Sequence, residues 1–268
     1  LDAGGLSRLF EVSGGGRLVL RGVRLVGGVA PAEGHGGCIH VSGEATRLAL
    51  DGGTWLAGGG AQRGGAIAVL GGGAIELAGA TIANARAAGT TMSARGGALY
   101  VEDGEATLLD LRIENAAAVG EGDRWAFGGA VAAWGAATVT LGDSTLTNAS
   151  AVTHGAGWAK GGGVFARGTA TVTLGDSTLA NASAVALGVN GTADGGGLFV
   201  FSGSIALSRS TISHATTTGR GGGLFVQGGS VLLTDASQLL DCTAALGASS
   251  FATGGETLYQ LPAPPGRW

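Results

Sequence analysis

The chain is poor in charged residues and nearly free of lysine. Of its 268 residues, 13% are charged, the formal net charge is −4, and Lys160 is the single lysine. Proteins that bind nucleic acid neutralise phosphates with clusters of lysine and arginine, and the sequence has no such cluster. The composition therefore argues against DNA or RNA as a partner.

Sequence motifs for nucleotide, hydrolase and zinc-protease chemistry are missing. There is no Gly-x-Gly-x-x-Gly, no Walker loop, no Gly-x-Ser-x-Gly and no His-Glu-x-x-His. His35, Cys38 and His40 lie close in sequence, but a fourth ligand for a metal ion is absent. We therefore expect no metal and no other cofactor.

What the chain has in abundance is glycine, 56 residues, arranged in a repeat. A glycine doublet, a small residue and an aliphatic residue recur together at spacings of 28, 32, 32, 33, 34 and 26 residues. The doublets begin at Gly36, Gly64, Gly96, Gly128, Gly161, Gly195 and Gly221. Repeats of this length are typical of solenoids, in which stacked neighbours bury one continuous core.

Two further short segments follow each doublet at a nearly constant distance in the sequence, and both have the period of a β-strand. Examples of the first are Val139-Thr140-Leu141 and Val172-Thr173-Leu174, and an example of the second is Thr145-Leu146-Thr147. No stretch has a helical period over ten residues, and the glycine content disfavours helix throughout. The sequence predicts an all-β, right-handed, single-stranded parallel β-helix of about eight three-strand coils.

The repeat register is continuous, which predicts one β-helix domain over residues 1–258 with a partial first coil at 1–17. The proline-rich residues 259–268 are expected to lead the chain off the last coil and cap it. The uncharged run 125–142 contains a complete repeat unit, so we expect no membrane span. Cys38 and Cys242 would lie roughly 30 Å apart in such a stack, too far for a disulfide.

The units Gly64-Gly65-Ala66-Ile67 and Thr81-Ile82-Ala83-Asn84 resemble a known pattern. The chain is similar to the pectin-lyase-like parallel β-helix class, and to the repeat surface proteins typified by the polymorphic membrane proteins. Its ending, Leu261 to Trp268, is similar to a segment of large uncharacterised extracellular β-helix proteins of unicellular algae. The resemblance implies a secreted or cell-surface protein with a structural or adhesive role.

Asparagine recurs two residues after an inward-facing aliphatic residue. Strand alternation would turn these side chains into the coil, where stacked amides form hydrogen-bonded ladders. We expect an internal polar ladder of Asn84, Asn115, Asn148 and Asn181. Asn190, in the sequon Asn190-Gly191-Thr192 of a long turn, is then the expected glycosylation site rather than Asn148 or Asn181.

Bulky residues suggest two contact surfaces. The outward positions after the doublets include Tyr100, Phe165, Phe199 and Phe225, either an exposed stripe for lateral association or a satellite core under the turns. The long turns before the doublets carry Trp125 and Trp158, either for recognition or as packing over the sheet edge.

The expected function is an extracellular structural or adhesive scaffold that serves as a subunit or segment of a surface coat or filament. Its expected partners are copies of itself, other extracellular proteins or glycans. The alternative is a β-helix that binds or cleaves polysaccharide. Asp143 and Asp176 occupy the same Gly-Asp-Ser-Thr slot on consecutive coils, which indicates a turn requirement rather than catalysis, so we do not expect an enzyme.

Overall fold

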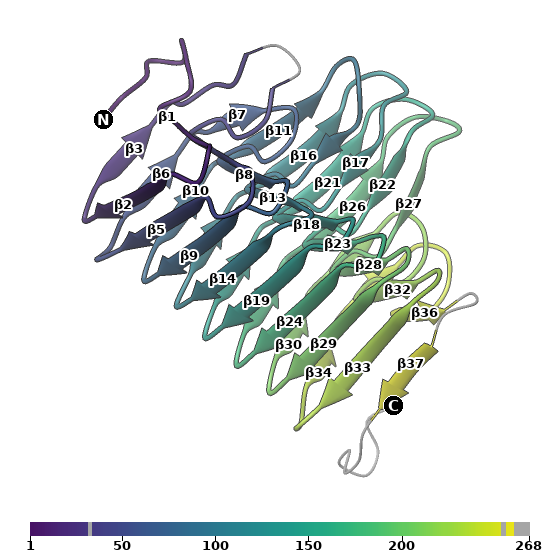
Figure 1. Ribbon diagram of the computed structural model, residues 1–268. Coiled ribbons are helices and arrows are strands. Elements are labelled where there is room, and N and C mark those ends of the chain that lie inside the picture. Colours follow the sequence, from purple (N-terminus) through teal and green to yellow (C-terminus); the bar gives the residue numbers. More distant parts are fainter. Residues whose placement is uncertain (32–33, 253–255, 260–268) are drawn as a thin grey trace.

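The computed structural model describes residues 1–31, 34–252 and 256–259, with side chains for residues 1–31 and 34–250. Over this part of the chain the molecule is an all-β parallel solenoid without a helix. Figure 1 shows the strands stacked in rows from the N-terminal to the C-terminal end. The predicted all-β parallel solenoid is confirmed. Of the exit segment predicted at residues 259–268, only Tyr259 is described, as the last residue of a strand, and the rest lies outside the described residues.

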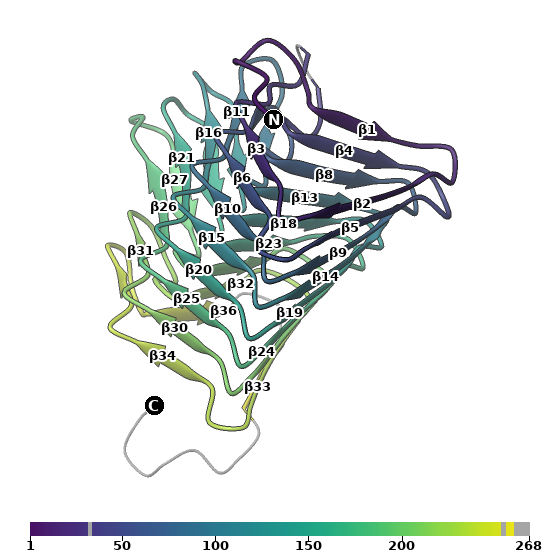
Figure 2. The same ribbon diagram turned by 90° about the vertical axis from the view of Figure 1, so that its left-hand side faces the viewer.

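Three long sheets form the walls of the coil, and Figure 2 looks along the stack. Sheet I contains β1 (Phe10–Val12), β4 (Ile39–Ser42), β8 (Ile67–Leu70), β13 (Leu99–Glu102), β18 (Val131–Trp134), β23 (Val164–Ala166), β28 (Leu198–Val200), β32 (Leu224–Val226) and β36 (Ser250–Ala252). Sheet II contains β2 (Arg17–Arg21), β5 (Arg47–Asp51), β9 (Ala74–Ala78), β14 (Glu105–Leu109), β19 (Thr138–Gly142), β24 (Thr171–Gly175), β29 (Ser204–Ser208), β33 (Ser230–Thr234) and β37 (Glu256–Tyr259). Sheet III contains β3 (Arg24–Val26), β6 (Trp55–Ala57), β10 (Thr81–Ala83), β15 (Arg112–Glu114), β20 (Thr145–Thr147), β25 (Thr178–Ala180), β30 (Thr211–Ser213) and β34 (Gln238–Leu240).

The long turns are themselves strands, which the sequence did not predict. They form two further parallel sheets beside the main coil. Sheet IV contains β7 (Gly60–Ala61), β11 (Arg86–Gly89), β16 (Ala117–Gly120), β21 (Ser150–Thr153), β26 (Ser183–Ala186), β31 (Thr216–Thr217) and β35 (Thr243–Ala244). Sheet V contains β12 (Ala94–Arg95), β17 (Ala126–Phe127), β22 (Trp158–Lys160) and β27 (Thr192–Asp194). The expectation of three strands per coil was therefore too low where these turns are long.

Equivalent residues stack in columns without a register slip. In sheet I, for example, Leu99 pairs with Ile67 on one side and with Val131 on the other. These aliphatic side chains point inward and are fully buried in one continuous core. Because side chains alternate between the two faces of a strand, the residues between them point out of the coil.

A second core joins sheets IV and V and consists of alanine. Its buried members are Ala87, Ala118, Ala151 and Ala184 from sheet IV and Ala94, Ala126, Ala159 and Ala193 from sheet V. Small side chains let two short sheets lie close together. The recurrent alanines of the long turns were the only sequence pattern that indicated these strands. Each strand is two to four residues long, which is too short for the pattern to be recognised in one coil.

The glycine doublet is a crossing point of the backbone. Gly128 has a φ of 64°, a backbone conformation that residues with a Cβ rarely adopt. A Cβ on Gly129 would collide with the carbonyl oxygen of Gly162 and with the backbone of Ser150 in sheet IV. The repeat therefore marks where the chain turns into sheet I while passing directly against sheet IV.

Serine hydroxyls form a buried polar ladder at the corner between sheets II and III. Ser144, Ser177 and Ser210 are each 1% exposed. The Oγ of Ser177 accepts a hydrogen bond of 3.1 Å from the backbone N–H of Ser144 and donates one of 2.8 Å to the carbonyl of Gly175. Ser210 does the same for Ser177 one coil further on. The internal ladder of this solenoid is therefore built from serine.

Candidate functional site

The predicted aromatic stripe is covered. Tyr100, Phe165, Phe199 and Phe225 project from the outer face of sheet I but are at most 2% exposed. Their column continues into sheet V through Phe127, whose ring centroid lies 4.7 Å from that of Phe165. Of the two interpretations, the satellite core is right, because sheet V folds over the stripe.

A second column lies beside the stripe and is partly exposed. Two residues beyond the stripe positions stand Trp134 at the end of β18, Arg167 just after β23 and Phe201 just after β28. The guanidinium carbon of Arg167 lies 4.5 Å from the ring centroid of Trp134 and 4.9 Å from that of Phe201. The guanidinium carbon of Arg95, in sheet V, lies 3.8 Å from the ring centroid of Trp134. Cations and rings thus alternate along the coil axis, as in cation–π pairs.

Lys160 is buried among aromatic rings at the edge of this column. Its Nζ lies 4.5 Å from the ring centroids of both Trp158 and Phe199, and donates a hydrogen bond of 3.2 Å to the side-chain oxygen of Gln227. Burial lowers the pKa of Lys160 to about 8, against the opposing effect of Asp194 on the neighbouring strand. The amine is therefore desolvated, and a negative group placed near it would favour its charged form.

Trp125 and Trp158 complete the surface. Their rings stack with centroids 4.7 Å apart and planes 7° apart, and they are 37% and 38% exposed. Trp125 lies just before β17 and Trp158 begins β22, so each ring stands beside a buried alanine in the sequence and faces away from the alanine core, next to Phe127 and Lys160. Packing over the sheet edge was one interpretation of these tryptophans and recognition was the other. Because more than a third of the surface of each residue is exposed to solvent, both tryptophans are accessible to a ligand.

We call this surface the basic aromatic face. Its members are Arg95, Trp125, Trp134, Trp158, Lys160, Arg167 and Phe201. Among them, sequence reasoning singled out only the tryptophans at 125 and 158. Trp134, Arg167 and Phe201 could have been found in the sequence, because each lies two residues after a position of the predicted stripe. No pattern in the sequence indicates that they contact residues of sheet V.

The asparagine ladder exists, but on the outside of the molecule. The Nδ2 of Asn115 donates to the Oδ1 of Asn84 at 3.3 Å, and Asn148 donates likewise to Asn115 at 3.1 Å. These three residues and Asn181 are all exposed, and their φ angles are 53° to 55°. The left-handed backbone interrupts strand alternation, so the side chain turns outward two residues after a buried aliphatic. The internal orientation predicted for these asparagines was wrong.

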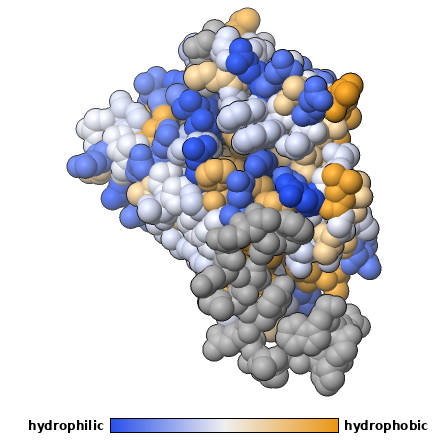
Figure 3. All heavy atoms as spheres, turned by 90° about the vertical axis from the view of Figure 1, so that its right-hand side faces the viewer, coloured by the Kyte–Doolittle hydropathy of each residue, from blue (hydrophilic) through white to orange (hydrophobic). Residues whose placement is uncertain are grey.

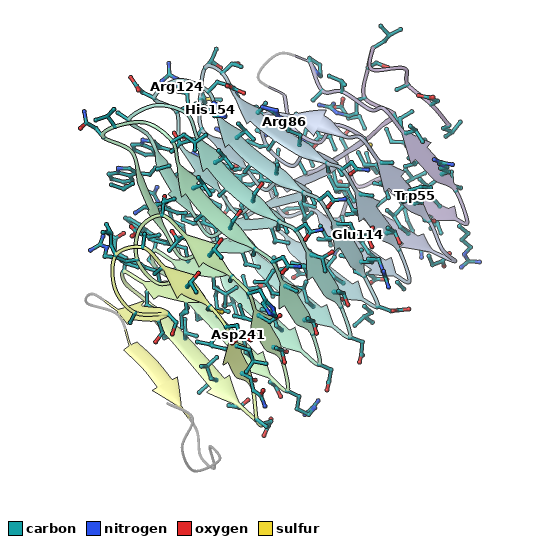
Figure 4. All side chains as sticks on the ribbon, turned by 180° about the vertical axis from the view of Figure 1, so that it is seen from behind. Trp55, Arg86, Glu114, Arg124, His154 and Asp241 are labelled. Carbon is teal, nitrogen blue, oxygen red and sulfur yellow. The ribbon has the colours of Figure 1, made fainter. Side chains whose placement is uncertain are left out.

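This correction changes the expectation for glycosylation. The amides of Asn148 and Asn181 face solvent, so the argument that sheltered these two sequons no longer applies. Asn190 is exposed as well, and glycan attachment there stays a prediction. Figure 4 shows the side of the molecule that bears sheet III, where Glu114, the neighbour of Asn115, is labelled.

The three residues considered as metal ligands do not come together. Cys38 is fully buried in the main core, and burial raises the pKa of its thiol to about 11. His35 and His40 lie outside the coil with ring centroids 5.8 Å apart. Within residues 1–31, 34–252 and 256–259, no group of three or more His, Cys, Asp or Glu side chains is placed to hold a metal ion.

Comparison with known proteins adds no family. No family model matches the chain, and no curated protein or solved structure matches it significantly. The likeness to pectin-lyase-like and polymorphic-membrane-protein repeats is therefore supported as a parallel β-solenoid and no further. In the described part of the chain, no helix is long and apolar enough to cross a membrane.

Proposed function

We propose that this protein is an extracellular adhesive solenoid that binds an anionic polysaccharide along the basic aromatic face, without cleaving it. The observation that carries the proposal is the alternation of Arg95, Trp134, Arg167 and Phe201 on a partly exposed surface. The faces of sugar rings stack on aromatic side chains, and arginine binds carboxylate or sulfate groups with two parallel hydrogen bonds.

The geometry also suits a polymer rather than a single sugar. Residues at equivalent positions of sheet I recur on each coil, and parallel strands are spaced about 4.8 Å apart. A ligand lying across the three coils of Trp134, Arg167 and Phe201 would therefore meet a ring or a cation at each of these steps. The exposed Trp125 and Trp158 stack extends this surface onto sheet V.

Lateral assembly into a coat or filament remains a second proposal with less support. The stripe expected to mediate it is buried, so it offers no apolar surface for assembly. Figure 3 shows hydrophobic residues interspersed with hydrophilic ones on the face turned to the viewer, rather than one apolar patch. Size-exclusion chromatography with light scattering tests assembly directly.

The binding proposal is tested with polysaccharides that differ in charge. We expect the protein to bind a polyuronate or a sulfated polysaccharide, to ignore a neutral glucan, and to bind less tightly as salt is added. Arg167→Gln and Trp158→Ala should each weaken binding about tenfold, which corresponds to ~1.4 kcal/mol. Arg112→Gln, on the exposed face of sheet III, is the matched control and should bind as the wild type does.

Two results would contradict the proposal. Equal affinity for neutral and charged polysaccharides would remove the role of the cations. Release of new reducing ends or unsaturated sugars during incubation would show that the chain cleaves its ligand.

A further inference from the structure

The basic aromatic face continues toward the N-terminal end of the solenoid as a column of cationic and imidazole groups. His35, Arg63 and Arg95 pair in sequence order as parallel bridges on consecutive coils. They stand beside the outer face of sheet I, next to His40 of β4 and Tyr100 of β13. Residues distant in the sequence thus meet on one surface.

Tyr100 lies at the centre of this group. Its ring centroid is 6.4 Å from that of His35, 5.8 Å from the guanidinium carbon of Arg63 and 6.0 Å from that of Arg95. Arg95 donates a hydrogen bond of 3.2 Å to the Tyr100 hydroxyl. His40 also lies beside His35, with 5.8 Å between the two ring centroids. We call these five residues the His–Arg cluster.

Among the described residues, four members of the cluster each have a buried nitrogen for which no hydrogen-bond partner is present. These atoms are the Nδ1 of His35, the Nε2 of His40 and the Nε atoms of Arg63 and Arg95. A buried polar atom without a partner is costly, and four in one place are unusual. An oxyanion, which only accepts hydrogen bonds, is the chemical complement of such a group once the side chains adjust to it.

The charges of the cluster are only partly balanced. Glu102 lies 3.9 Å from Arg63, and Glu11 forms an ion pair of 2.9 Å with Arg8, which also donates to the carbonyls of His35 and Gly36. Within the described part of the chain, Arg95 has no carboxylate within ion-pair distance. The described residues around the cluster thus carry a surplus of positive charge, which favours an anion at this end of the face.

We propose that the His–Arg cluster binds a single oxyanion group, a sulfate or a carboxylate of the bound polysaccharide. The site rests on the proposed function for its biological ligand, but its chemistry can be tested without a polymer. It gives the face a defined anchor at its N-terminal end.

The proposal carries a pH dependence. Burial, with help from Arg63, His40, Arg8 and Arg95, lowers the pKa of His35 to about 4, and burial also lowers the pKa of His40. The groups that face this pair are Arg8, Glu11, Arg63, Arg95, Tyr100 and Glu102. A bound oxyanion stabilises the charged imidazoles and raises their pKa, so binding takes up protons and tightens as the pH falls from 7 to 5.

The experiment is a titration of the purified protein with sodium sulfate, and separately with glucuronate, at low ionic strength. Isothermal calorimetry gives the affinity, and the NMR resonances of the His35 and His40 rings report the place. We expect saturable binding that shifts both rings and strengthens at pH 5. Preference between the two anions distinguishes a sulfated ligand from a uronate ligand.

Substitutions test where the anion binds. Arg63→Gln and Arg95→Gln should each weaken anion binding at least tenfold, while Arg112→Gln, on the exposed side of sheet III and outside the basic aromatic face, is the control and should leave it unchanged. Circular dichroism checks that each variant is folded, and Arg63→Lys, which keeps the charge, should retain part of the affinity. Linear, unsaturable heats, or ring shifts that Arg63→Gln does not abolish, would overturn the proposal.

The two proposals fail independently. Sulfate binding at the cluster without polysaccharide binding would leave this site standing and refute the proposed function. If the protein bound polysaccharide equally well with Arg63→Gln and did not bind sulfate, the proposed function would stand and the anion site would be refuted.

Discussion

Single residues at the corners decide which way the polar groups of this solenoid point. Asparagine in a left-handed conformation turns its amide outward at one corner, and serine turns its hydroxyl inward at another. Both ladders satisfy polar groups from coil to coil, but only the serine ladder satisfies buried backbone N–H groups. Stability should therefore depend on the serines far more than on the asparagines.

Ser177→Ala tests this difference. The substitution leaves the buried backbone N–H of Ser144 without its acceptor, so we expect a loss of about 1–3 kcal/mol in the free energy of unfolding. Urea denaturation followed by circular dichroism measures it. Thr178→Ala, the exposed neighbour in β25, is the control and should change stability by less than about 0.5 kcal/mol. Equal effects of the two substitutions would contradict the ladder.

Lys160 makes a prediction about pH. Its pKa is about 8 in the folded protein and 10.5 ordinarily, so the unfolded chain holds this proton through the interval where the folded protein has lost it. The free energy of unfolding should then rise from pH 8 to pH 10. Above pH 10, Tyr100 opposes the trend, because burial raises the pKa of its hydroxyl to about 12.

Denaturation midpoints at pH 7.5, 9 and 10 provide the measurement. The comparison is with Lys160→Met, which keeps the side-chain length and removes the titrating group. We expect the wild type to gain stability relative to this variant across the range. A constant difference between the two would mean that the amine is not desolvated.

At the scale of the element, the glycine doublet is what allows five sheets to share one backbone path. Gly129 lies so close to the strand at Ser150 that no Cβ fits. The same crossing recurs at each doublet that a sheet IV strand passes, and the long turns with their alanine core depend on it. The repeat was recognisable in the sequence, but its cause was visible only once sheet IV was known.

Gly129→Ala should therefore be severe. Because the obstructing atoms are backbone, the coil must separate to make room, and we expect destabilisation of more than about 4 kcal/mol. Thermal denaturation of the purified variant, or its loss from the soluble fraction, is the readout. Gly53→Ala is the matched control: its φ is 77° with no atom near the added Cβ, so it should cost only about 1 kcal/mol.

At the scale of the whole molecule, the repeating coil could be predicted from the sequence, but the contacts between residues of different sheets could not. Period-two columns such as Leu99 and Val131 identify the coil, because each coil repeats the same local pattern. Arg95 and Trp134 meet across two sheets and 39 positions of sequence, from 95 to 134, and no local pattern encodes that contact. The outward turn of Asn148 also escaped prediction, since one left-handed residue reverses the alternation.

The molecule also contains an internal control for its proposed function. Three tryptophans, Trp125, Trp134 and Trp158, lie on the basic aromatic face, whereas Trp55 lies on sheet III, on the side shown in Figure 4. Trp55 packs against Arg24, so it too combines a ring with a cation. A ligand that bound to any such pair would not distinguish between the two sides.

Oxidative footprinting of tryptophan, read by mass spectrometry with and without a saturating anionic polysaccharide, therefore tests the central claim most directly. The account predicts that the ligand protects Trp125, Trp134 and Trp158 from oxidation and leaves Trp55 as reactive as in the free protein. Protection of Trp55 with no change at the other three would place the ligand on the opposite side and contradict the account.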